Sequence, residues 1–159
     1  MNERDYFLGL SNFYEIGTVR FKLLFDFFGS AGRIWEADKN ELISVGLSRD
    51  LVEKFVVFRK NFDFEKKSLE LSKKEIKFLS LIDKEYPDLL KQIPDPPIVL
   101  YIKGNLGDLK KAIGVVGTRK MTAYGAKAAE NITRELVLSG VTVVSGMARG
   151  IDAVAHRTA

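Results

Sequence analysis

The sequence predicts an α/β protein in which a small helical domain, residues 1–70, precedes the first part of a parallel-sheet domain, residues 71–159. The prediction of a parallel-sheet domain depends on two short apolar runs, residues 112–116 and 141–144. Strands that are apolar throughout are typical of a parallel sheet that helices cover on both faces. Each run leads into a polar loop that contains glycine and then into a helical stretch. The two runs therefore predict a βαβ unit.

The helices of the first domain are predicted by apolar residues that recur every three or four positions. One such pattern runs from Val19 to Phe28 and ends at Gly29, and another follows Ser48, a residue type that often caps helix N-termini. The aromatic residues of this region follow the same spacing, so we expect them to build a small core. The face of the first of these helices that we expect to be buried consists of Val19, Leu23, Leu24, Phe27 and Phe28.

Two hydrophobic–glycine turns, Ile16-Gly17 and Val45-Gly46, join predicted helices in this domain. In a helix-hairpin-helix motif, such a glycine lets backbone amides of the next helix approach a DNA phosphate. The same glycines would also serve simply to turn the chain between packed helices. We expect a helix-hairpin-helix fold, with Gly17 and Gly46 as candidate secondary DNA contacts, and both explanations of the glycines stay open.

The middle of the chain predicts a linker and two further strands. Residues 59–77 mix basic and acidic side chains, which is typical of a solvated helix face or a linker, and we place the domain boundary near residue 70. A strand-like run over residues 76–79 and an apolar run over residues 98–102 predict strands that we expect to extend the parallel sheet. Residues 92–97 contain three prolines and are therefore expected to be extended.

The composition is that of an ordinary globular protein, with 46% hydrophobic and 29% charged residues. The absence of cysteine excludes disulfides and thiolate metal sites, and the N-terminus lacks a secretory signal pattern, so we expect a cytoplasmic protein. The net charge is +4, and residues 112–159 hold six Lys and Arg residues against three Asp and Glu residues. A basic excess at this place favours a polyanionic ligand, either a nucleic acid or a nucleotide. We expect no metal, no cofactor and no membrane association.

The loops after the two predicted parallel strands lie where open parallel sheets bind their ligands, at the carboxyl ends of the strands. The first loop offers the Thr118 hydroxyl, the Arg119 guanidinium and room for close approach at Gly117. Arginine supplies a fork of donors that matches phosphate oxygens. The second loop, Ser145 to Gly150, adds a hydroxyl, two glycines and Arg149. These residue types predict a phosphate-binding site.

Structural roles are the alternative for several residues around these loops. Gly117 and Gly146 would also be needed for tight turns between strand and helix, and the sequence leaves this open. Thr122 is a candidate cap of the helix after the first loop, whose N-terminal dipole would attract an anion. Asp152 would repel a phosphate, so we expect it to stabilise the start of the second helix. His156 lies four residues further on, and we expect it to pair with Asp152 and to have no catalytic role.

Several short motifs follow one another along the chain in a fixed order. They are Tyr86-Pro87, Asp95-Pro96-Pro97, Leu100-Tyr101, Val116-Gly117-Thr118-Arg119, Tyr124-Gly125, Ser145-Gly146-Met147-Ala148-Arg149-Gly150-Ile151-Asp152 and Ala155-His156. Over nearly the whole chain, this ordered set resembles the DNA-processing protein A family, DprA, which is also called Smf. The resemblance implies a SAM-like helical domain followed by an extended Rossmann-like domain.

The resemblance also implies a non-catalytic protein that binds single-stranded DNA, protects incoming DNA in natural transformation and loads the RecA recombinase. It implies a homodimer for the full-length protein. Family members run well beyond residue 159, and an open parallel sheet normally continues for several strands, so we expect the sheet domain to be incomplete at its C-terminus. By resemblance, the residues that bind DNA phosphates are Gly117, Thr118, Arg119, Ser145, Gly146, Ala148, Arg149 and Gly150.

Other classes of function are the alternatives. A phosphoribohydrolase of the lysine-decarboxylase-like type has a related core and would bind a nucleotide, but it needs a Pro-Gly-Gly-x-Gly-Thr loop with a nearby glutamate, which this sequence lacks. A dinucleotide-dependent oxidoreductase needs Gly-x-Gly-x-x-Gly, and Gly114, Gly117 and Gly125 have the wrong spacing. A pure protein-interaction role for the helical domain is neither favoured nor excluded.

Overall fold

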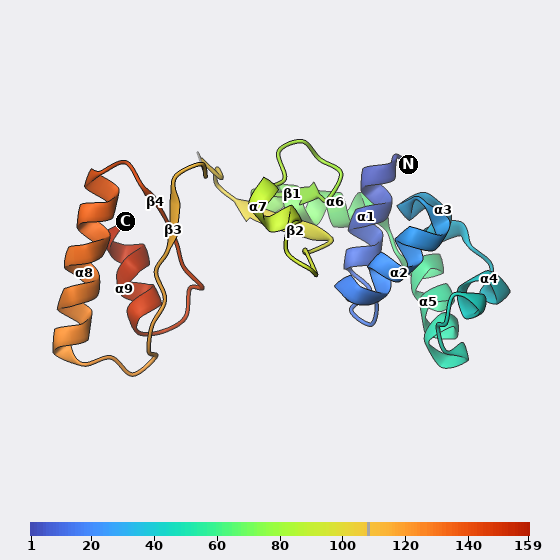
Figure 1. Cartoon of the computed structure of the whole chain (residues 1–159). Helices are drawn as coiled ribbons and strands as arrows, with labels where there is room; N and C mark the ends of the chain where they lie inside the picture. The colour runs from blue at the N-terminus through green and yellow to red at the C-terminus, as the bar shows by residue number, and fades with distance from the viewer. Residues whose placement is uncertain (108) are drawn as a thin grey trace. The chain divides into compact units, whose positions relative to one another are not determined.

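The computed structural model describes residues 1–107 and 109–159 and divides into two compact units, residues 1–105 and residues 106–159 (Figure 1). The described residues form a mixed α/β structure that is mostly helical and contains two small sheets. This confirms the predicted fold class at its coarse level.

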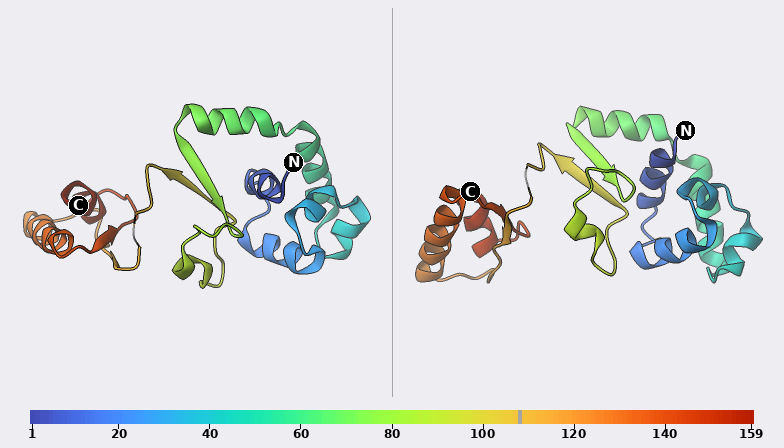
Figure 2. Two further views of the ribbon diagram at one scale, coloured as in Figure 1. Left: turned by 90° about the horizontal axis from the view of Figure 1, so that it is seen from above. Right: turned by 45° about the horizontal axis from the view of Figure 1, so that its top comes forward.

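The N-terminal unit consists of helices followed by a hairpin of two strands. The short helix α7 (Asp88–Lys91) lies in the connection between strand β1 (Ile76–Ser80) and strand β2 (Val99–Lys103), which Figure 2 shows from two further sides. The helices that precede them are α1 (Glu3–Ser11), α2 (Thr18–Phe28), α3 (Ala31–Glu36), α4 (Lys39–Ser44), α5 (Arg49–Asn61) and α6 (Phe64–Lys73).

The ends of the predicted helices lie where the sequence puts them. Helix α2 ends before Gly29, whose left-handed φ of 77° lets its N–H donate to the carbonyl of Phe25. The Ser48 hydroxyl accepts a hydrogen bond from the amide of Leu51 at 3.3 Å, so Ser48 is the N-cap of α5, as predicted. Local residue preferences therefore determine these boundaries.

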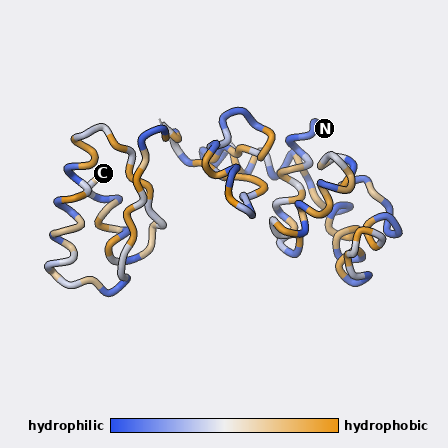
Figure 3. Tube along the Cα trace, viewed as in Figure 1, coloured by the Kyte–Doolittle hydropathy of each residue, from blue (hydrophilic) through white to orange (hydrophobic). Residues whose placement is uncertain are grey.

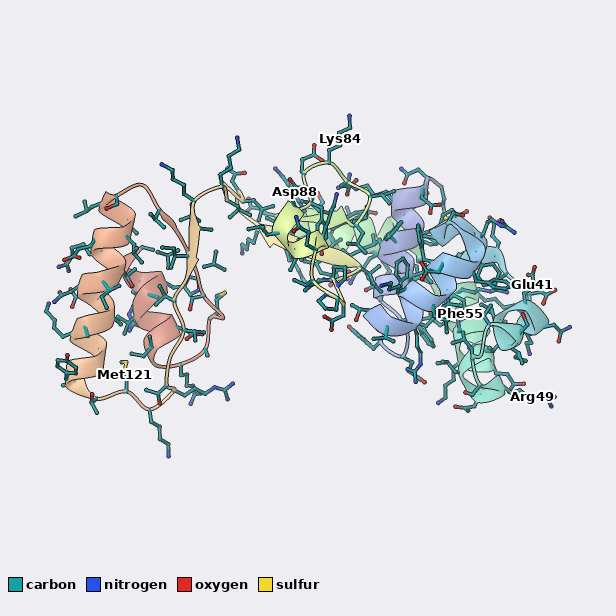
Figure 4. The ribbon with its side chains drawn as sticks, in the orientation of Figure 1. Glu41, Arg49, Phe55, Lys84, Asp88 and Met121 are labelled. Atoms are coloured by element: carbon teal, nitrogen blue, oxygen red, sulfur yellow. The ribbon has the colours of Figure 1, made fainter. Side chains whose placement is uncertain are left out.

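Aromatic side chains build the core of the N-terminal unit, as the sequence predicts. Phe55 is fully buried among the helices (Figure 4), and its ring contacts that of Trp35 edge-on at 5.8 Å. The centre of the Phe13 ring lies 5.4 Å from that of the Phe55 ring. Edge-on and tilted pairs of this kind add to the stabilisation that burial gives.

The predicted buried face of α2 is wrong in part. The residues that α2 buries are Phe21, Leu24 and Phe28. Most of α2 is apolar, so spacing alone selects no single face; packing does, because the ring of Phe21 meets that of Phe7 on α1 at 5.3 Å. The exposed members of the predicted face are Val19 at 74%, Leu23 at 48% and Phe27 at 61% exposure.

Strands β1 and β2 pair with each other in antiparallel register, with Phe78 opposite Tyr101. The expectation that they extend the parallel sheet is therefore wrong. Arg4 on α1 joins the hairpin to the helices, because its Nε lies 2.9 Å from the Asp83 carboxylate and its guanidinium lies 4.6 Å from the centre of the Phe78 ring. Such contacts explain why the compact unit reaches residue 105, whereas the domain boundary near residue 70 stays a prediction.

The C-terminal unit is a β-α-β-α segment made of β3 (Ala112–Gly114), α8 (Ala123–Leu138), β4 (Thr142–Val144) and α9 (Ile151–Thr158). Strands β3 and β4 pair in parallel, with Ile113 opposite Val143, which is the βαβ unit that the two apolar runs predict. Helices α8 and α9 lie to one side of these strands (Figure 1).

The expectation that these strands are buried on both faces is wrong within the described residues. Ile113 is 45% and Val144 is 48% exposed, although Figure 3 shows this stretch as hydrophobic. Two helices on one side leave the other face of a two-stranded sheet uncovered.

Among the described residues, none of the helices is both long enough and apolar enough to cross a bilayer.

Candidate nucleic-acid interface

Two loops at one edge of the small parallel sheet hold the predicted site residues. The first loop, residues 115–122, joins β3 to α8, and the second loop, residues 145–150, joins β4 to α9. Because β3 and β4 are parallel, both loops leave the same edge of the sheet. The pairing continues past β3, since the amide of Val115 donates to the carbonyl of Val144 at 2.9 Å.

The two loops contact each other at Gly150, which has a left-handed φ of 89°. A Cβ atom added here would lie 2.1 Å from the carbonyl oxygen of Thr118 and 2.8 Å from the Cα of Arg119. The amide of Ile151 donates to the same Thr118 carbonyl at 3.2 Å. Only glycine fits this position. Because Gly150 follows Arg149 in the sequence, the same contact brings the backbone of Arg119 close to that of Arg149.

Close packing also explains the other two glycines of the loops. A Cβ atom added to Gly117 would lie 2.7 Å from the Cβ of Ile151, and one added to Gly146 would lie 3.0 Å from a carboxylate oxygen of Asp152. The structural explanation that the sequence leaves open therefore applies to Gly117 and, less severely, to Gly146. Their contact with phosphate stays a prediction.

The hydroxyl groups of the two loops form hydrogen bonds within the protein. Thr118 donates to the carbonyl of Lys120 at 3.2 Å and accepts from its amide at 3.1 Å, which closes a turn. Ser145 donates to the carbonyl of Val115 at 2.6 Å and so ties the second loop to the first. A phosphate would receive a hydrogen bond from either hydroxyl only after these contacts rearranged.

The arginines of the loops differ from the cations on α8. Arg119 and Arg149 are exposed, and within the described part of the chain neither has an ion-pair partner. Lys127 and Arg134, by contrast, both pair with Glu130. The hydrogen bond from Lys127, and after it the one from Arg134, holds the pKa of the Glu130 carboxyl below its ordinary value. The loop arginines therefore present positive charge that no described ion pair compensates.

The two helices begin differently. The Thr122 hydroxyl accepts a hydrogen bond from the amide of Gly125 at 3.0 Å, which confirms Thr122 as the N-cap of α8. Helix α9 has Gly150 as its N-cap, and no side chain caps it. The positive end of the α9 dipole thus lies in the second loop without a capping oxygen from the N-cap residue.

Asp152, in the first turn of α9, lies between the two loops. Its side chain is buried, with 4% of the residue exposed. One carboxylate oxygen accepts from the amide of Gly117 and the other from the amide of Ala148, each at 3.4 Å. The predicted pair with His156 is absent from the described contacts, because the imidazole Nε2 lies 3.2 Å from the carbonyl oxygen of Ser145 instead.

The joining role of Asp152 is the feature that sequence reasoning missed. Its position after Gly150-Ile151 predicts a residue at the start of a helix, which is where it lies. Nothing in the spacing indicates that its carboxylate accepts a hydrogen bond from the amide of a residue 35 positions away. That contact follows from the parallel pairing of β3 and β4.

The two candidate glycines of the helical unit have different surroundings. Gly46 has a φ of 105°, so its backbone conformation alone favours glycine. Gly17 is the N-cap of α2 with an ordinary φ of −75°, and an added Cβ would meet nothing within 4 Å. The turn explains Gly46, whereas neither backbone nor packing requires glycine at position 17.

Comparison with known proteins gives one consistent result. Residues 77–159 match the model of the family described as DNA recombination-mediator protein A. The chain is 37% identical to protein Smf of Synechocystis sp. over 98% of its own length, and it spans 40% of the length of that relative. Over 51% of its length it is 45% identical to the DNA processing protein DprA of Bacillus subtilis, of which it covers 28%.

Among solved structures, DNA processing protein A from Streptococcus pneumoniae matches with a TM-score of 0.74 at 26% sequence identity. This match covers 99% of the present chain and 54% of the other. The family model covers more than half of the chain, and the ordered motifs quoted above lie largely within it. The chain belongs to the DprA/Smf family of DNA recombination mediators.

Proposed function

We propose that this chain is the part of a DNA recombination mediator that binds the phosphate backbone of single-stranded DNA, and that Arg119 and Arg149 make the principal contacts. The contact at Gly150 supports this most directly, because it holds the backbone of both arginines together at one edge of the sheet. Both guanidinium groups are exposed and without ion pairs among the described residues. Two unpaired arginines whose backbones lie close together suit consecutive phosphates.

The remaining parts of the family role are proposed for the full-length protein. These are protection of incoming DNA, loading of RecA, dimerisation and the absence of catalysis. We also propose that residues 1–70 form a SAM-like domain and that residues 71–159 form the beginning of an extended Rossmann-like domain. Membership of the family supports each of these assignments.

The proposal is tested by fluorescence anisotropy of a labelled oligo-dT strand titrated with the 159-residue chain. We expect Arg119→Ala to weaken binding by at least about tenfold, since one charge-assisted contact contributes about 1.5–3 kcal/mol and about 1.4 kcal/mol is tenfold in affinity. Arg134→Ala is the matched control, because it removes the same charge from an arginine that already pairs with Glu130. We expect this control to bind nearly as well as the parent chain.

Two results would contradict the proposal. An equal loss of DNA affinity in Arg119→Ala and Arg134→Ala would mean that binding depends on the net charge of the chain and not on the loop. Folded parent chain that shows no binding at low salt would mean that these residues lack a sufficient site. Unlabelled nucleoside monophosphate that competes at low concentration would instead favour a nucleotide pocket.

A further inference from the structure

A buried carboxylate lies between the two loops. Asp152 has 4% of its surface exposed, and its two oxygens accept from the amides of Gly117 in the first loop and Ala148 in the second. An ionised acceptor strengthens such bonds, and burial shields them from water. The carboxylate therefore joins two segments that are 31 residues apart in the sequence and adjacent only in the fold.

The surroundings of Asp152 leave the loops little freedom to move apart. Gly146 has no room for a side chain without approaching the carboxylate at 3.0 Å. The neighbouring Ile151 packs against Gly117, and its amide binds the carbonyl of Thr118. Through these contacts the first turn of α9 fixes the backbone of Gly117 and Thr118, which lead directly into Arg119.

We propose that Asp152 is a positioning residue, which fixes the two loops relative to each other and on which the grip of Arg119 on a phosphate depends. The dependence on a phosphate rests on the proposed function, whereas the joining of the loops does not. Asp152 itself does not touch the DNA. Its negative charge acts on backbone amides beneath the site and through them on the arginine.

The proposal predicts that Asp152→Asn weakens DNA binding, whereas the change in net charge alone would strengthen it. Asp152→Asn raises the net charge from +4 to +5, and removal of a negative charge should tighten binding to a polyanion. If Asp152 positions the loops, the same substitution weakens binding instead, because an amide nitrogen now faces one of two backbone N–H groups. We expect a loss of about tenfold in affinity for oligo-dT.

Glu135→Gln is the matched control. It removes the same charge from an exposed residue of α8 in the same unit. We expect it to bind oligo-dT as well as the parent chain or slightly better. Circular dichroism shows whether each variant is folded before it is titrated.

A double-mutant cycle distinguishes positioning from a general structural role. In the Asp152→Asn background, Arg119→Ala should cost less than about threefold in affinity instead of at least about tenfold, since a displaced arginine has little left to lose. Independent effects of the two substitutions would overturn the dependence of Arg119 on Asp152.

A measurement without DNA separates this inference from the proposed function. In ¹H–¹⁵N spectra of the parent chain and of Asp152→Asn, we expect the amides of Gly117 and Ala148 to shift together while those of the helical unit do not. If the two amides shift but the parent does not bind DNA, the proposed function fails and the joining role stands. If the parent binds through Arg119 while Asp152→Asn binds as well or better, or if neither amide shifts, the inference is overturned.

Discussion

At the scale of single residues, glycines and one tyrosine show how local geometry determines stability. Gly150 combines a left-handed φ with a carbonyl oxygen 2.1 Å from the position of its missing Cβ. Gly114 in β3 has an ordinary φ and nothing within 4 Å of an added Cβ. The two positions therefore provide a matched pair.

Gly150→Ala should destabilise the chain by about 2–3 kcal/mol, because the strained backbone and the steric clash act together. Gly114→Ala should change stability by less than about 0.5 kcal/mol. Thermal unfolding followed by circular dichroism measures both. Equal melting curves for the two variants would show that the contact between the loops contributes nothing to stability.

Tyr86 is buried, with 1% of its surface exposed, and its hydroxyl donates to the carbonyl of Pro97 at 2.8 Å. Burial raises the pKa of the Tyr86 hydroxyl above its ordinary value of 10.0. The unfolded chain therefore loses this proton at a lower pH than the folded chain does. The stability that Tyr86 contributes is complete below pH 10 and falls as the pH rises through the pKa of the folded state.

Tyr86→Phe should cost about 1 kcal/mol near neutral pH, because it removes a buried hydrogen bond. The difference in free energy of unfolding between parent and variant should shrink above pH 10. Urea unfolding followed by Trp35 fluorescence at neutral and alkaline pH measures this difference. A constant difference across that range would contradict the assignment.

At the scale of elements, the hairpin of β1 and β2 depends on contacts with α1. Arg4 carries three of them: an ion pair with Asp83, a hydrogen bond to the carbonyl of Phe78 and a contact with the Phe78 ring. Because the Arg4 side chain is 44% exposed, solvent screens its ion pair, and the ring and carbonyl contacts supply much of the effect.

Arg4→Ala should lower stability by about 1–2 kcal/mol, since it removes a cation–π contact and a charge-assisted hydrogen bond. Arg33→Ala, at an exposed position of α3, is the control and should be nearly neutral. Urea unfolding followed by Trp35 fluorescence compares them. Hydrogen exchange in β1 should also accelerate in Arg4→Ala, and protection equal to that of the parent chain would contradict the role of Arg4.

The sequence also predicts elements better than it predicts their partners. Helix ends follow from local signals such as Gly29 and Ser48, and these were correct. The pairing of β1 with β2 was wrong because an apolar run of five residues fits an antiparallel hairpin as well as a parallel sheet. The predicted buried face of α2 is wrong in part because the helix is apolar on most sides, and packing against neighbours such as Phe7 on α1 selects the face.

At the scale of the whole molecule, the sequence predicted the coarse α/β class, the family and the two loops. It did not predict how the loops contact each other. Gly150 meets Thr118, and Asp152 meets Gly117, only because β3 and β4 are parallel, and no local signal indicates these distances. The Ser145 hydroxyl binds the carbonyl of Val115 in the other loop, whereas the Thr118 hydroxyl closes a local turn with Lys120. Contact of either hydroxyl with phosphate stays a prediction.

We propose that the loop arginines bind the phosphate backbone of single-stranded DNA. The most direct test is the salt dependence of oligo-dT binding by the parent chain and by Arg119→Ala, with Arg134→Ala beside them. Each lost phosphate contact should reduce the slope of log affinity against log salt by about 0.7 for single strands. Arg119→Ala should show this reduction, and Arg134→Ala should not. Identical slopes for the parent chain and Arg119→Ala would contradict the proposal.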